Sequence, residues 1–161
     1  MGPTGAGKSA LAVRLAEQLP LEIISVDSAL VYRGMDIGTA KPGPDERRRV
    51  KHHLIDILDP WESASVAWWL NKAAECCQEI EGRGKLALFV GGTPLYLKAL
   101  LRGLFDGPPG DGDLRRRLIQ ESDRDGPRAL HQRLAQVDPV SARRIHSNDV
   151  RRIIRALEVF E

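Results

Sequence analysis

The sequence predicts an α/β fold in which helices flank a parallel sheet, followed by a separate helical part. Three observations lead to this fold class. A glycine-rich loop opens the chain, short apolar runs alternate with helical patterns as far as residue 104, and only helical patterns occur after residue 112. Alternating strands and helices are typical of a parallel sheet, because parallel strands need long crossover connections.

The first element is a phosphate-binding loop. It matches the pattern G-x-x-x-x-G-K-[ST] and consists of Gly2, Pro3, Thr4, Gly5, Ala6, Gly7, Lys8 and Ser9. Such a loop turns backbone N–H groups toward a phosphate chain, Lys8 adds a positive charge, and the Ser9 hydroxyl is the candidate ligand for Mg²⁺. We therefore expect a P-loop NTPase-like fold that binds a di- or triphosphate, with Mg²⁺ as cofactor. The loop normally follows a buried strand and only Met1 precedes it, so we expect the first strand to be missing.

The next elements begin the sheet. Leucines and alanines at helical spacing predict a helix from Ser9 to Leu19, which Pro20 ends. The apolar run at 21–26 predicts a strand, and Asp27 stands at its carboxyl end. Ligands of open α/β sheets bind beyond the carboxyl ends of the strands. Asp27 is therefore a candidate Mg²⁺ ligand or general base, with a capping aspartate as the alternative.

The stretch that follows carries weaker signals. Residues 28–50 are expected to be irregular, with the arginines at 47–49 on a solvated surface. A second strand is expected at 53–57 and a long helix at 65–83. We expect the tryptophans in this part of the chain to lie in the core.

A second candidate site residue follows the next strand. The continuous apolar run at 86–90 predicts a strand that is covered on both faces. It leads into two glycines, after which Thr93 suits a helix N-cap and Pro94 suits the first turn of a helix that extends to about residue 102. Thr93 thus either caps this helix or points its hydroxyl into the crevice that holds Asp27.

The character of the sequence changes after residue 104. The composition predicts a P-loop core at 1–104, a linker rich in glycine and proline at 105–112, and a helical part at 113–161. Helical patterns in the last part occur at 113–122, 127–136, 141–145 and 149–161.

Positive charge is concentrated in the helical part. Residues 1–112 carry 13 lysines and arginines against 14 acidic residues, whereas residues 113–161 carry 11 arginines against 8 acidic residues. In the last helix the apolar residues share one side, and Arg151, Arg152 and Arg155 occupy the other. This side is a candidate surface for a polyanion, with a solvated face as the alternative. One of the three arginines at 115–117 is a candidate charge clamp for the phosphate site.

Composition excludes some classes of protein. No apolar run reaches the roughly 18 residues of a membrane span, and no signal peptide is visible. Cys76 and Cys77 are adjacent in a helical pattern without metal or disulfide spacing, so we expect free thiols. These features indicate a cytoplasmic location and no membrane partner.

Several blocks of the sequence resemble the bacterial tRNA dimethylallyltransferase (IPP transferase) family. The longest runs from Ile24 to Pro42 and includes Val26-Asp27-Ser28-Ala29-Leu30 and Ile37-Gly38-Thr39-Ala40-Lys41-Pro42. The others are the P-loop, His52-His53-Leu54-Ile55-Asp56-Ile57, Val90-Gly91-Gly92-Thr93 with Tyr96, and Arg151-Arg152-Ile153-Ile154-Arg155-Ala156-Leu157-Glu158. The blocks follow one another in order along the whole chain. The resemblance implies an enzyme, a prenyltransferase, that moves a dimethylallyl group from dimethylallyl diphosphate to N6 of adenosine-37, beside the anticodon of tRNA.

The resemblance also implies roles for individual residues. The P-loop binds the diphosphate of dimethylallyl diphosphate, Asp27 accepts a proton from the adenine amine, and Thr93 and Arg115 complete the catalytic set. The residues expected to contact the tRNA anticodon stem-loop are Asp27, Ser28, Ala29, Leu30, Thr93, Arg115, Arg151, Arg152, Ile153, Ile154 and Arg155. In the family, residues after the linker form a helical insertion that grips the RNA and then returns to the core. A monomer is expected.

The sequence also allows other functions. A small-molecule kinase that binds ATP would share the P-loop and Asp27 but would not explain the arginine-rich helix. An adenylate isopentenyltransferase would act on a free nucleotide, and a catalytically inactive RNA-binding fragment would bind RNA without turnover. Family members are about twice as long, so we expect this chain to be truncated at both ends and its activity to depend on what is absent. It also departs from them at Pro94, where glycine or methionine is common, and at Arg151, where glutamine is usual.

Overall fold

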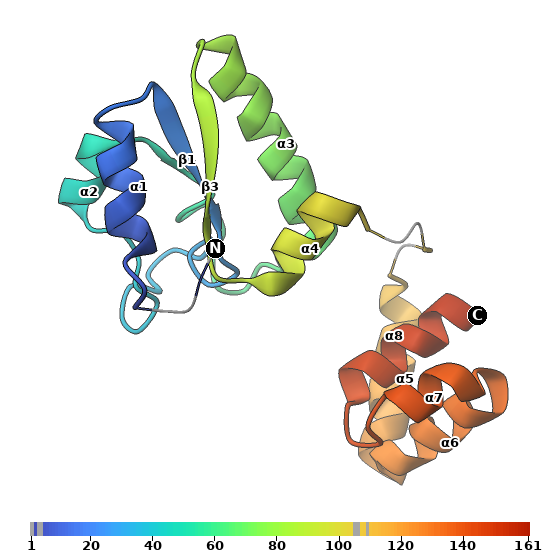
Figure 1. The fold of residues 1–161 in the computed structure, drawn as a ribbon. Helices are drawn as coiled ribbons and strands as arrows, with labels where there is room; N and C mark the ends of the chain where they lie inside the picture. Colours follow the sequence, from blue (N-terminus) through green and yellow to red (C-terminus); the bar gives the residue numbers. More distant parts are fainter. Residues whose placement is uncertain (1, 3–4, 105–106, 109) are drawn as a thin grey trace. The chain divides into compact units, whose positions relative to one another are not determined.

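The computed structural model describes residues 2, 5–104, 107–108 and 110–161, which fall into two compact units, Met1–Leu104 and Phe105–Glu161 (Figure 1). Within the expected linker, Phe105, Asp106 and Pro109 lie outside the described residues, as do Pro3 and Thr4 of the P-loop. Each unit has its own apolar core.

The first unit is an α/β layer structure. Its elements are α1 (Lys8–Ala16), β1 (Leu21–Val26), α2 (Pro44–Arg49), β2 (His52–His53), α3 (Val66–Gly82), β3 (Leu86–Gly91) and α4 (Pro94–Arg102). The three strands form one parallel sheet in the order β2-β1-β3, which places β1 in the middle. The predicted parallel sheet with flanking helices is confirmed.

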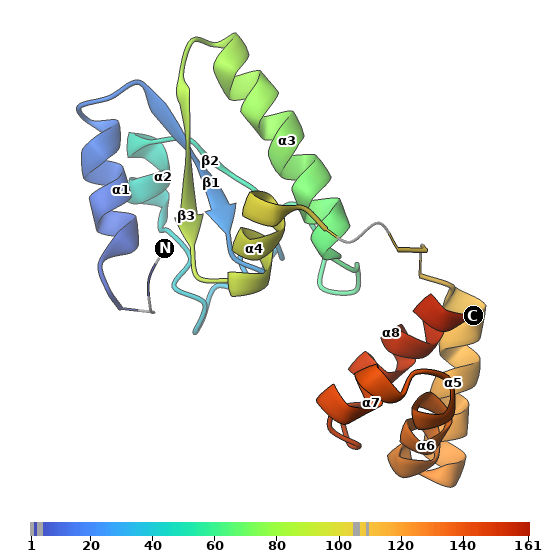
Figure 2. The same cartoon turned by 45° about the vertical axis from the view of Figure 1, so that its right-hand side comes forward.

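Helices cover both faces of this sheet. On one face, α1 packs through Ala12 and Val13 against Ile23 of β1. On the other face, Trp69 of α3 packs against Ile24 and its neighbours in the larger core. Figure 2 shows α1 and α2 on one side of the strands and α3 on the other. The alternation of faces follows from the pleat of β1, since successive side chains point in opposite directions.

The strand β3 is partly exposed. It pairs with β1 from Leu86 to Gly91, but within the described residues no strand pairs with its far edge. Leu86 is 59% exposed, and the rest of the strand is only half-buried. Both faces of β3 are nevertheless covered as expected, since Ala87 and Phe89 pack against the core on the α3 side and Leu88 and Val90 against the core on the α1 side. The partial exposure of the strand follows from its position at the edge of the sheet.

The segment between β1 and α3 departs most from the sequence prediction. The second strand is limited to His52–His53, since Leu54 and Asp56 adopt left-handed backbone conformations with φ of 59° and 56°. The helix α2 was not predicted. It begins after Gly43, whose N–H donates to the Glu46 side chain in a capping box.

The tryptophans divide between core and surface. Trp69 is fully buried, whereas Trp61 is 83% exposed, so the expectation of a core position was wrong for Trp61. Cys76 and Cys77 are free thiols, and burial raises the pKa of both.

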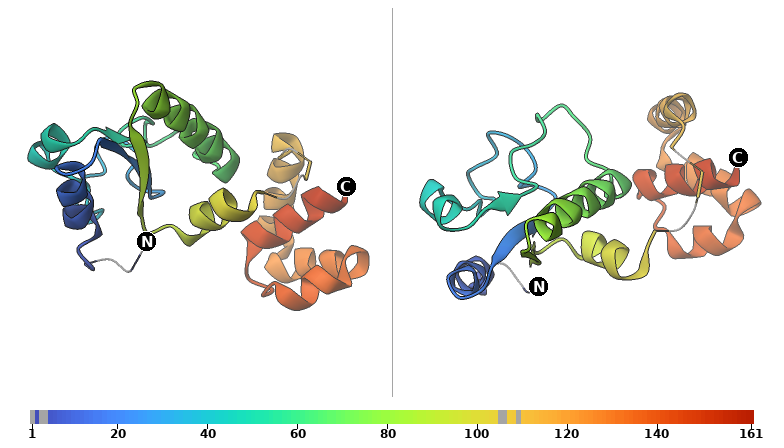
Figure 3. Two further views of the ribbon diagram at one scale, coloured as in Figure 1. Left: turned by 45° about the horizontal axis from the view of Figure 1, so that its top comes forward. Right: turned by 90° about the horizontal axis from the view of Figure 1, so that it is seen from above.

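The described residues of the second unit form helices α5 to α8 and no strand (Figure 3). The helices are α5 (Gly112–Asp125), α6 (Pro127–Val137), α7 (Pro139–Arg144) and α8 (Val150–Phe160). Aspartates at 111, 138 and 149 accept hydrogen bonds from the first amides of α5, α7 and α8. The core of the unit is formed by leucines and isoleucines of α5, α6 and α8, including Ile153, Ile154 and Leu157.

Within the described part of the chain, no helix is both long and apolar enough to span a bilayer.

Candidate functional site

The phosphate-binding loop leads into the first turn of α1. Gly5 and Gly7 have φ of 83° and 75°, a left-handed conformation that glycine adopts without steric cost. Gly7 is the N-cap of α1, and Lys8 and Ser9 are its first two residues. The first N–H groups of a helix have no intrahelical acceptor and attract anions. The described part of the loop therefore has the backbone geometry that the motif predicts.

A close approach of two chain segments shapes the carboxyl edge of the sheet. A Cβ atom on Gly91 would lie 2.2 Å from the carbonyl oxygen of Val26, so only glycine fits at the end of β3. The same oxygen accepts hydrogen bonds from the N–H groups of Gly92 (3.1 Å) and Thr93 (3.0 Å). The turn after β3 is thus folded onto the end of β1, which brings Thr93 to the residues that follow Val26.

Thr93 contacts the predicted base-binding segment directly. Its Oγ1 accepts a hydrogen bond from the Ser28 N–H at 3.0 Å and lies 3.4 Å from the Ser28 hydroxyl oxygen. Thr93 is the N-cap residue of α4, yet its side chain makes no capping bond to that helix. Of the two sequence interpretations, the simple helix cap is disfavoured, because the Thr93 hydroxyl binds Ser28, next to Asp27, and not the first amides of α4.

Asp27 anchors the turn that carries this contact. Its Oδ1 accepts a hydrogen bond from the Ala29 N–H at 2.9 Å. The Oδ2 atom takes part in no hydrogen bond or ion pair within the described residues, and the side chain is half-exposed. We call residues 27–30 the base-facing turn, after the role that the family resemblance implies for them. One carboxylate oxygen of Asp27 therefore shapes this turn, while the other is available to a ligand.

Two stacked aromatic side chains hold the end of β1 just before the base-facing turn. The buried indole of Trp69 donates from Nε1 to the carbonyl oxygen of Ser25 at 3.1 Å. Its ring stacks on Tyr96 with a centroid distance of 4.6 Å and an interplanar angle of 18°. Burial raises the pKa of the Tyr96 phenol. Helices α3 and α4 thus fix the backbone just before Asp27.

A small cavity joins the P-loop helix to the base-facing turn. It has a volume of about 30 Å³ and is lined by Ser9, Ser25, Leu30 and Pro42 among others. The Ser25 hydroxyl oxygen is buried and has no hydrogen-bond partner among the described residues. The two parts of the site that the sequence predicts separately, Ser9 and the base-facing turn, are therefore neighbours.

The described part of the P-loop contains one candidate oxygen ligand for the expected Mg²⁺. Among the described residues, no group of three histidine, cysteine or acidic side chains forms a metal cage. Mg²⁺ commonly takes most of its ligands from phosphate oxygens and water, with only one or two from the protein. Ser9, in the first turn of α1, supplies one such hard oxygen ligand.

Arg115 is held by a carboxylate of its own unit. Its Nε and Nη2 donate to Glu158 at 3.0 and 2.7 Å, and the Glu158 side chain is only 1% exposed. Because Nε and Nη2 bind the carboxylate, Nη1 of Arg115 is directed away from Glu158. The Arg115 side chain is half-exposed. Sequence reasoning did not identify Glu158 as the partner of Arg115.

The predicted RNA-contacting residues of α8 occupy two different faces. Arg151 and Arg152 are exposed, whereas Ile153 and Ile154 are buried in the core of the second unit. Arg151 and Arg115 line a groove of about 360 Å³, with an apolar floor formed by Ile119, Val150 and Ile154. Arg155 donates to the carbonyl oxygen of Pro108 at 3.0 Å and lies 3.5 Å from Glu158.

Two further polar clusters lie in the first unit and were missed from the sequence. One surrounds Asp56 and contains Asp36, Lys41 and Arg47. The other surrounds Glu22, in a strand where the apolar pattern predicts burial, and contains His53, Arg83 and Lys85. A buried carboxylate in an apolar strand is the one local signal for the second cluster, since such a charge needs partners.

The comparisons with known proteins agree on one family. The sequence profile described as IPP transferase matches residues 30–161. The tRNA dimethylallyltransferase of Methylococcus capsulatus is 56% identical over 160 residues, and that of Ralstonia pickettii is 55% identical over 160 residues. Each alignment covers 99% of this chain but only 51% and 49% of those relatives.

Solved structures give the same result. The tRNA isopentenylpyrophosphate transferase of Bacillus halodurans superposes with a TM-score of 0.63 at 48% identity, over 98% of this chain and 52% of that protein. A eukaryotic dimethylallyltransferase acting on tRNA superposes with a TM-score of 0.77 at 31% identity, over 99% of this chain and 40% of that protein. This chain spans about half the length of the curated relatives it matches. From its P-loop to the arginines of α8, it belongs to the IPP transferase family.

Proposed function

We propose that this protein transfers a dimethylallyl group from dimethylallyl diphosphate to N6 of adenosine-37 of tRNA, giving N6-(dimethylallyl)adenosine. The observation that carries the proposal is the Thr93–Ser28 contact, which joins two blocks 65 residues apart at the carboxyl edge of the sheet. The relatives named tRNA dimethylallyltransferase support this reading and give no support to an ATP-dependent kinase.

The P-loop supplies the leaving-group site. The amides at the start of α1 and the Lys8 ammonium stabilise the negative charge that develops on the diphosphate as the allylic C–O bond breaks. Mg²⁺ held at Ser9, when bound, supplies further positive charge to that diphosphate. The electron pair of the broken bond leaves with the diphosphate.

The base-facing turn supplies the acceptor site. As the N6–C bond forms, the exocyclic amine of adenine must lose a proton, and Asp27 Oδ2 is the available carboxylate oxygen. The Thr93 hydroxyl fixes Ser28 and so holds the turn against which the adenine rests. The target base must leave the stacked anticodon loop to reach this crevice.

The second unit supplies the RNA surface. Exposed Arg151 and Arg152 fit contacts with the phosphates of the anticodon stem-loop, and Arg115 offers Nη1 beside them. We infer that the protein works in the cytoplasm and acts as a monomer.

The donor requirement tests the proposal. An unmodified anticodon stem-loop is incubated with either dimethylallyl diphosphate and Mg²⁺ or ATP and Mg²⁺, and the phosphate products are measured. We expect inorganic diphosphate only with the prenyl donor and no ADP with ATP. Release of ADP would favour a kinase, and RNA binding without any release would favour an inactive RNA-binding fragment.

A further inference from the structure

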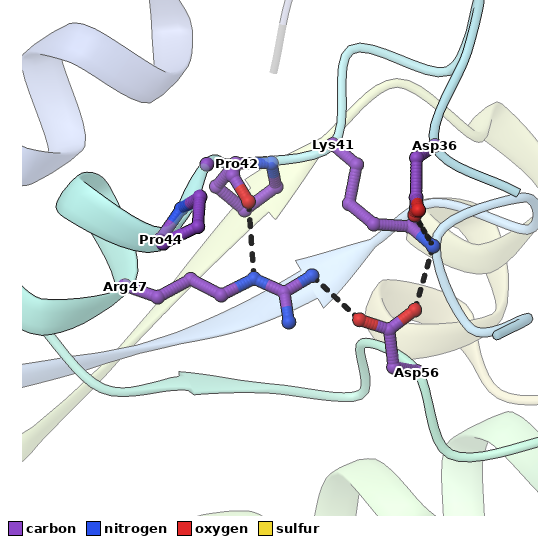
Figure 4. Close-up of a pocket in the computed structure, with 7 residues that line it drawn as sticks. Asp36, Lys41, Pro42, Pro44, Arg47 and Asp56 are labelled. Carbon is purple, nitrogen blue, oxygen red and sulfur yellow. Dashed lines mark hydrogen bonds and ion pairs between the residues drawn. The ribbon is translucent and has the colours of Figure 1, made fainter. Parts of the chain in front are cut away.

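Asp56 is the centre of a cluster of charges beside the base-facing turn. Its Oδ1 accepts a hydrogen bond from Lys41 Nζ at 2.6 Å, and its Oδ2 accepts one from Arg47 Nη2 at 2.7 Å. Figure 4 shows the two cationic side chains reaching this carboxylate from different segments of the chain. Although burial opposes ionisation, the hydrogen bonds from Lys41 and Arg47 lower the pKa of Asp56, so the carboxylate is charged near neutral pH.

The two cations also bind the chain that precedes them. Lys41, whose side chain is 4% exposed, donates to the carbonyl oxygen of Tyr32 at 2.8 Å and pairs with Asp36 at 2.8 Å. Arg47 Nε donates to the carbonyl oxygen of Pro42 at 3.0 Å. These groups line a pocket of about 430 Å³ and satisfy one another. The cluster therefore folds residues 32–47 onto Asp56.

The backbone of Asp56 reaches the base-facing turn itself. Its N–H donates to the carbonyl oxygen of Leu30, the last residue of that turn, at 3.0 Å. The next two N–H groups, of Ile57 and Leu58, both donate to the carbonyl oxygen of Val31. Asp56 makes this contact with a φ of 56°, a left-handed conformation that is unfavourable for a non-glycine residue and persists where the surroundings enforce it.

We propose that Lys41, Arg47 and Asp56 are positioning residues for prenyl transfer, because the two cations hold Asp56 in the left-handed conformation that fixes Leu30. This inference rests on the proposed function of the base-facing turn. Without the cations, Asp56 is free to relax to an ordinary backbone conformation. Its N–H then no longer donates a hydrogen bond to the carbonyl oxygen of Leu30. The turn that holds Asp27 would no longer be fixed at both ends.

Two adjacent arginines of α2 provide a matched test. Arg47 binds Asp56, whereas Arg48 is 72% exposed and, among the residues that the structure describes, pairs only with Asp45 on its own helix. We expect Arg47→Gln to lower kcat for the stem-loop about tenfold, since small misplacements of reacting groups are costly, and to leave the KM for dimethylallyl diphosphate unchanged. Arg48→Gln removes the same charge and should leave both constants unchanged. Equal kcat values for the two variants would overturn the inference.

Hydrogen exchange gives a second measurement that does not need turnover. The exchange rates of the Ser28 and Ala29 amides report on the conformation of the base-facing turn, because these amides donate hydrogen bonds to Thr93 and Asp27. We expect Arg47→Gln and Lys41→Met to speed their exchange, Lys41→Arg to restore slow exchange in part, and Arg48→Gln to have no effect. Unaltered exchange in Arg47→Gln and Lys41→Met would overturn the positioning role. A chain that shows this exchange pattern but never forms prenylated RNA would instead contradict the proposed function.

Discussion

At the scale of single residues, the site depends on short contacts between segments that are distant in sequence. Gly91 permits the turn after β3 to lie on the carbonyl group of Val26, and this places Thr93 against Ser28. The sequence allows Thr93 to be a helix cap or a site residue and slightly favours the second. The structure separates these interpretations because the hydroxyl binds Ser28 and makes no capping bond to α4.

Thr93→Val tests this contact. Valine has nearly the same shape as threonine but cannot accept the hydrogen bond of the Ser28 amide. Because that amide is near solvent, we expect a stability loss of no more than about 1 kcal/mol and a fall of about tenfold in kcat. Thr93→Ser keeps the oxygen and serves as the control. Equal activity of the valine and serine variants would show that the contact is not needed.

Asp27→Asn tests the proton acceptor. Asparagine retains an oxygen for the Ala29 amide, so the turn is kept while the carboxylate is lost. We expect prenyl transfer to fall by about 10²- to 10⁴-fold, the usual contribution of a general base, with the affinity for dimethylallyl diphosphate unchanged. Transfer at the wild-type rate would exclude Asp27 as the base.

At the scale of secondary-structure elements, β1 has different roles at its two ends. Its carboxyl end leads into the base-facing turn, and its amino end carries the buried Glu22. The carboxylate accepts hydrogen bonds from Arg83 (2.7 Å), His53 (2.6 Å) and Lys85 (3.1 Å). These contacts connect β1 to β2 and to the residues just before β3, so the cluster joins all three strands.

This cluster predicts a specific pH dependence of stability. The hydrogen bond from Arg83 lowers the pKa of Glu22 from 4.5 to about 2, against the opposing effect of burial and with help from His53 and Lys85. Because the folded-state pKa lies below the unfolded value, the stabilisation is complete above the unfolded value and is lost as the pH falls toward 2. With allowance for solvent around the cations, it is on the order of 2 kcal/mol.

Urea unfolding of Glu22→Gln between pH 7 and pH 2.5 measures this effect. We expect the variant to be less stable than the wild type at pH 6 and the difference to shrink steadily below pH 4.5. The exposed carboxylate of Glu17, which pairs with Arg49 at the surface, provides the control variant Glu17→Gln. A difference that stayed constant across this range would contradict the role of the Glu22 charge.

The helix α8 predicts a salt dependence of RNA binding. Arg151 and Arg152 are exposed, so their replacement by glutamine should leave the fold intact and remove phosphate contacts. We expect weaker stem-loop binding and a reduction of about 1 to 2 in the slope of log K against log salt. Arg124→Gln, which disrupts an exposed pair with Asp125, is the control and should change the slope less. An unaltered slope in the double variant would mean that these arginines are solvated.

The elements differ in how well the sequence predicts them. Strand β1 and helices α3 and α8 follow from local periodicity, because each buries one continuous set of apolar side chains. The helix α2 has no buried residues and is held by its cap and by Arg47, so no apolar pattern marks it. The expected strand at 53–57 ends after His53 because Leu54 and Asp56 adopt left-handed backbone conformations. At Asp56 the contacts that accompany this conformation come from partners 9 or more residues away, which local patterns do not contain.

At the scale of the whole molecule, the two units carry different groups of candidate site residues. The first holds the P-loop, the base-facing turn and Thr93 on one sheet, and the second holds the arginines of α5 and α8 on a core of its own. The chain spans about half the length of its curated relatives. The resemblance of its motifs predicted the family, whereas the Asp56 and Glu22 clusters became visible only in three dimensions.

The mass of the RNA product tests the central claim most directly. The protein is incubated with an unmodified anticodon stem-loop, dimethylallyl diphosphate and Mg²⁺, without ATP, and the RNA is then weighed by mass spectrometry. We predict that one hydrogen of the RNA is replaced by one dimethylallyl group, located at N6 of adenosine-37, and that Asp27→Asn abolishes this product. RNA of unchanged mass, from protein that binds both the stem-loop and dimethylallyl diphosphate, would contradict the account.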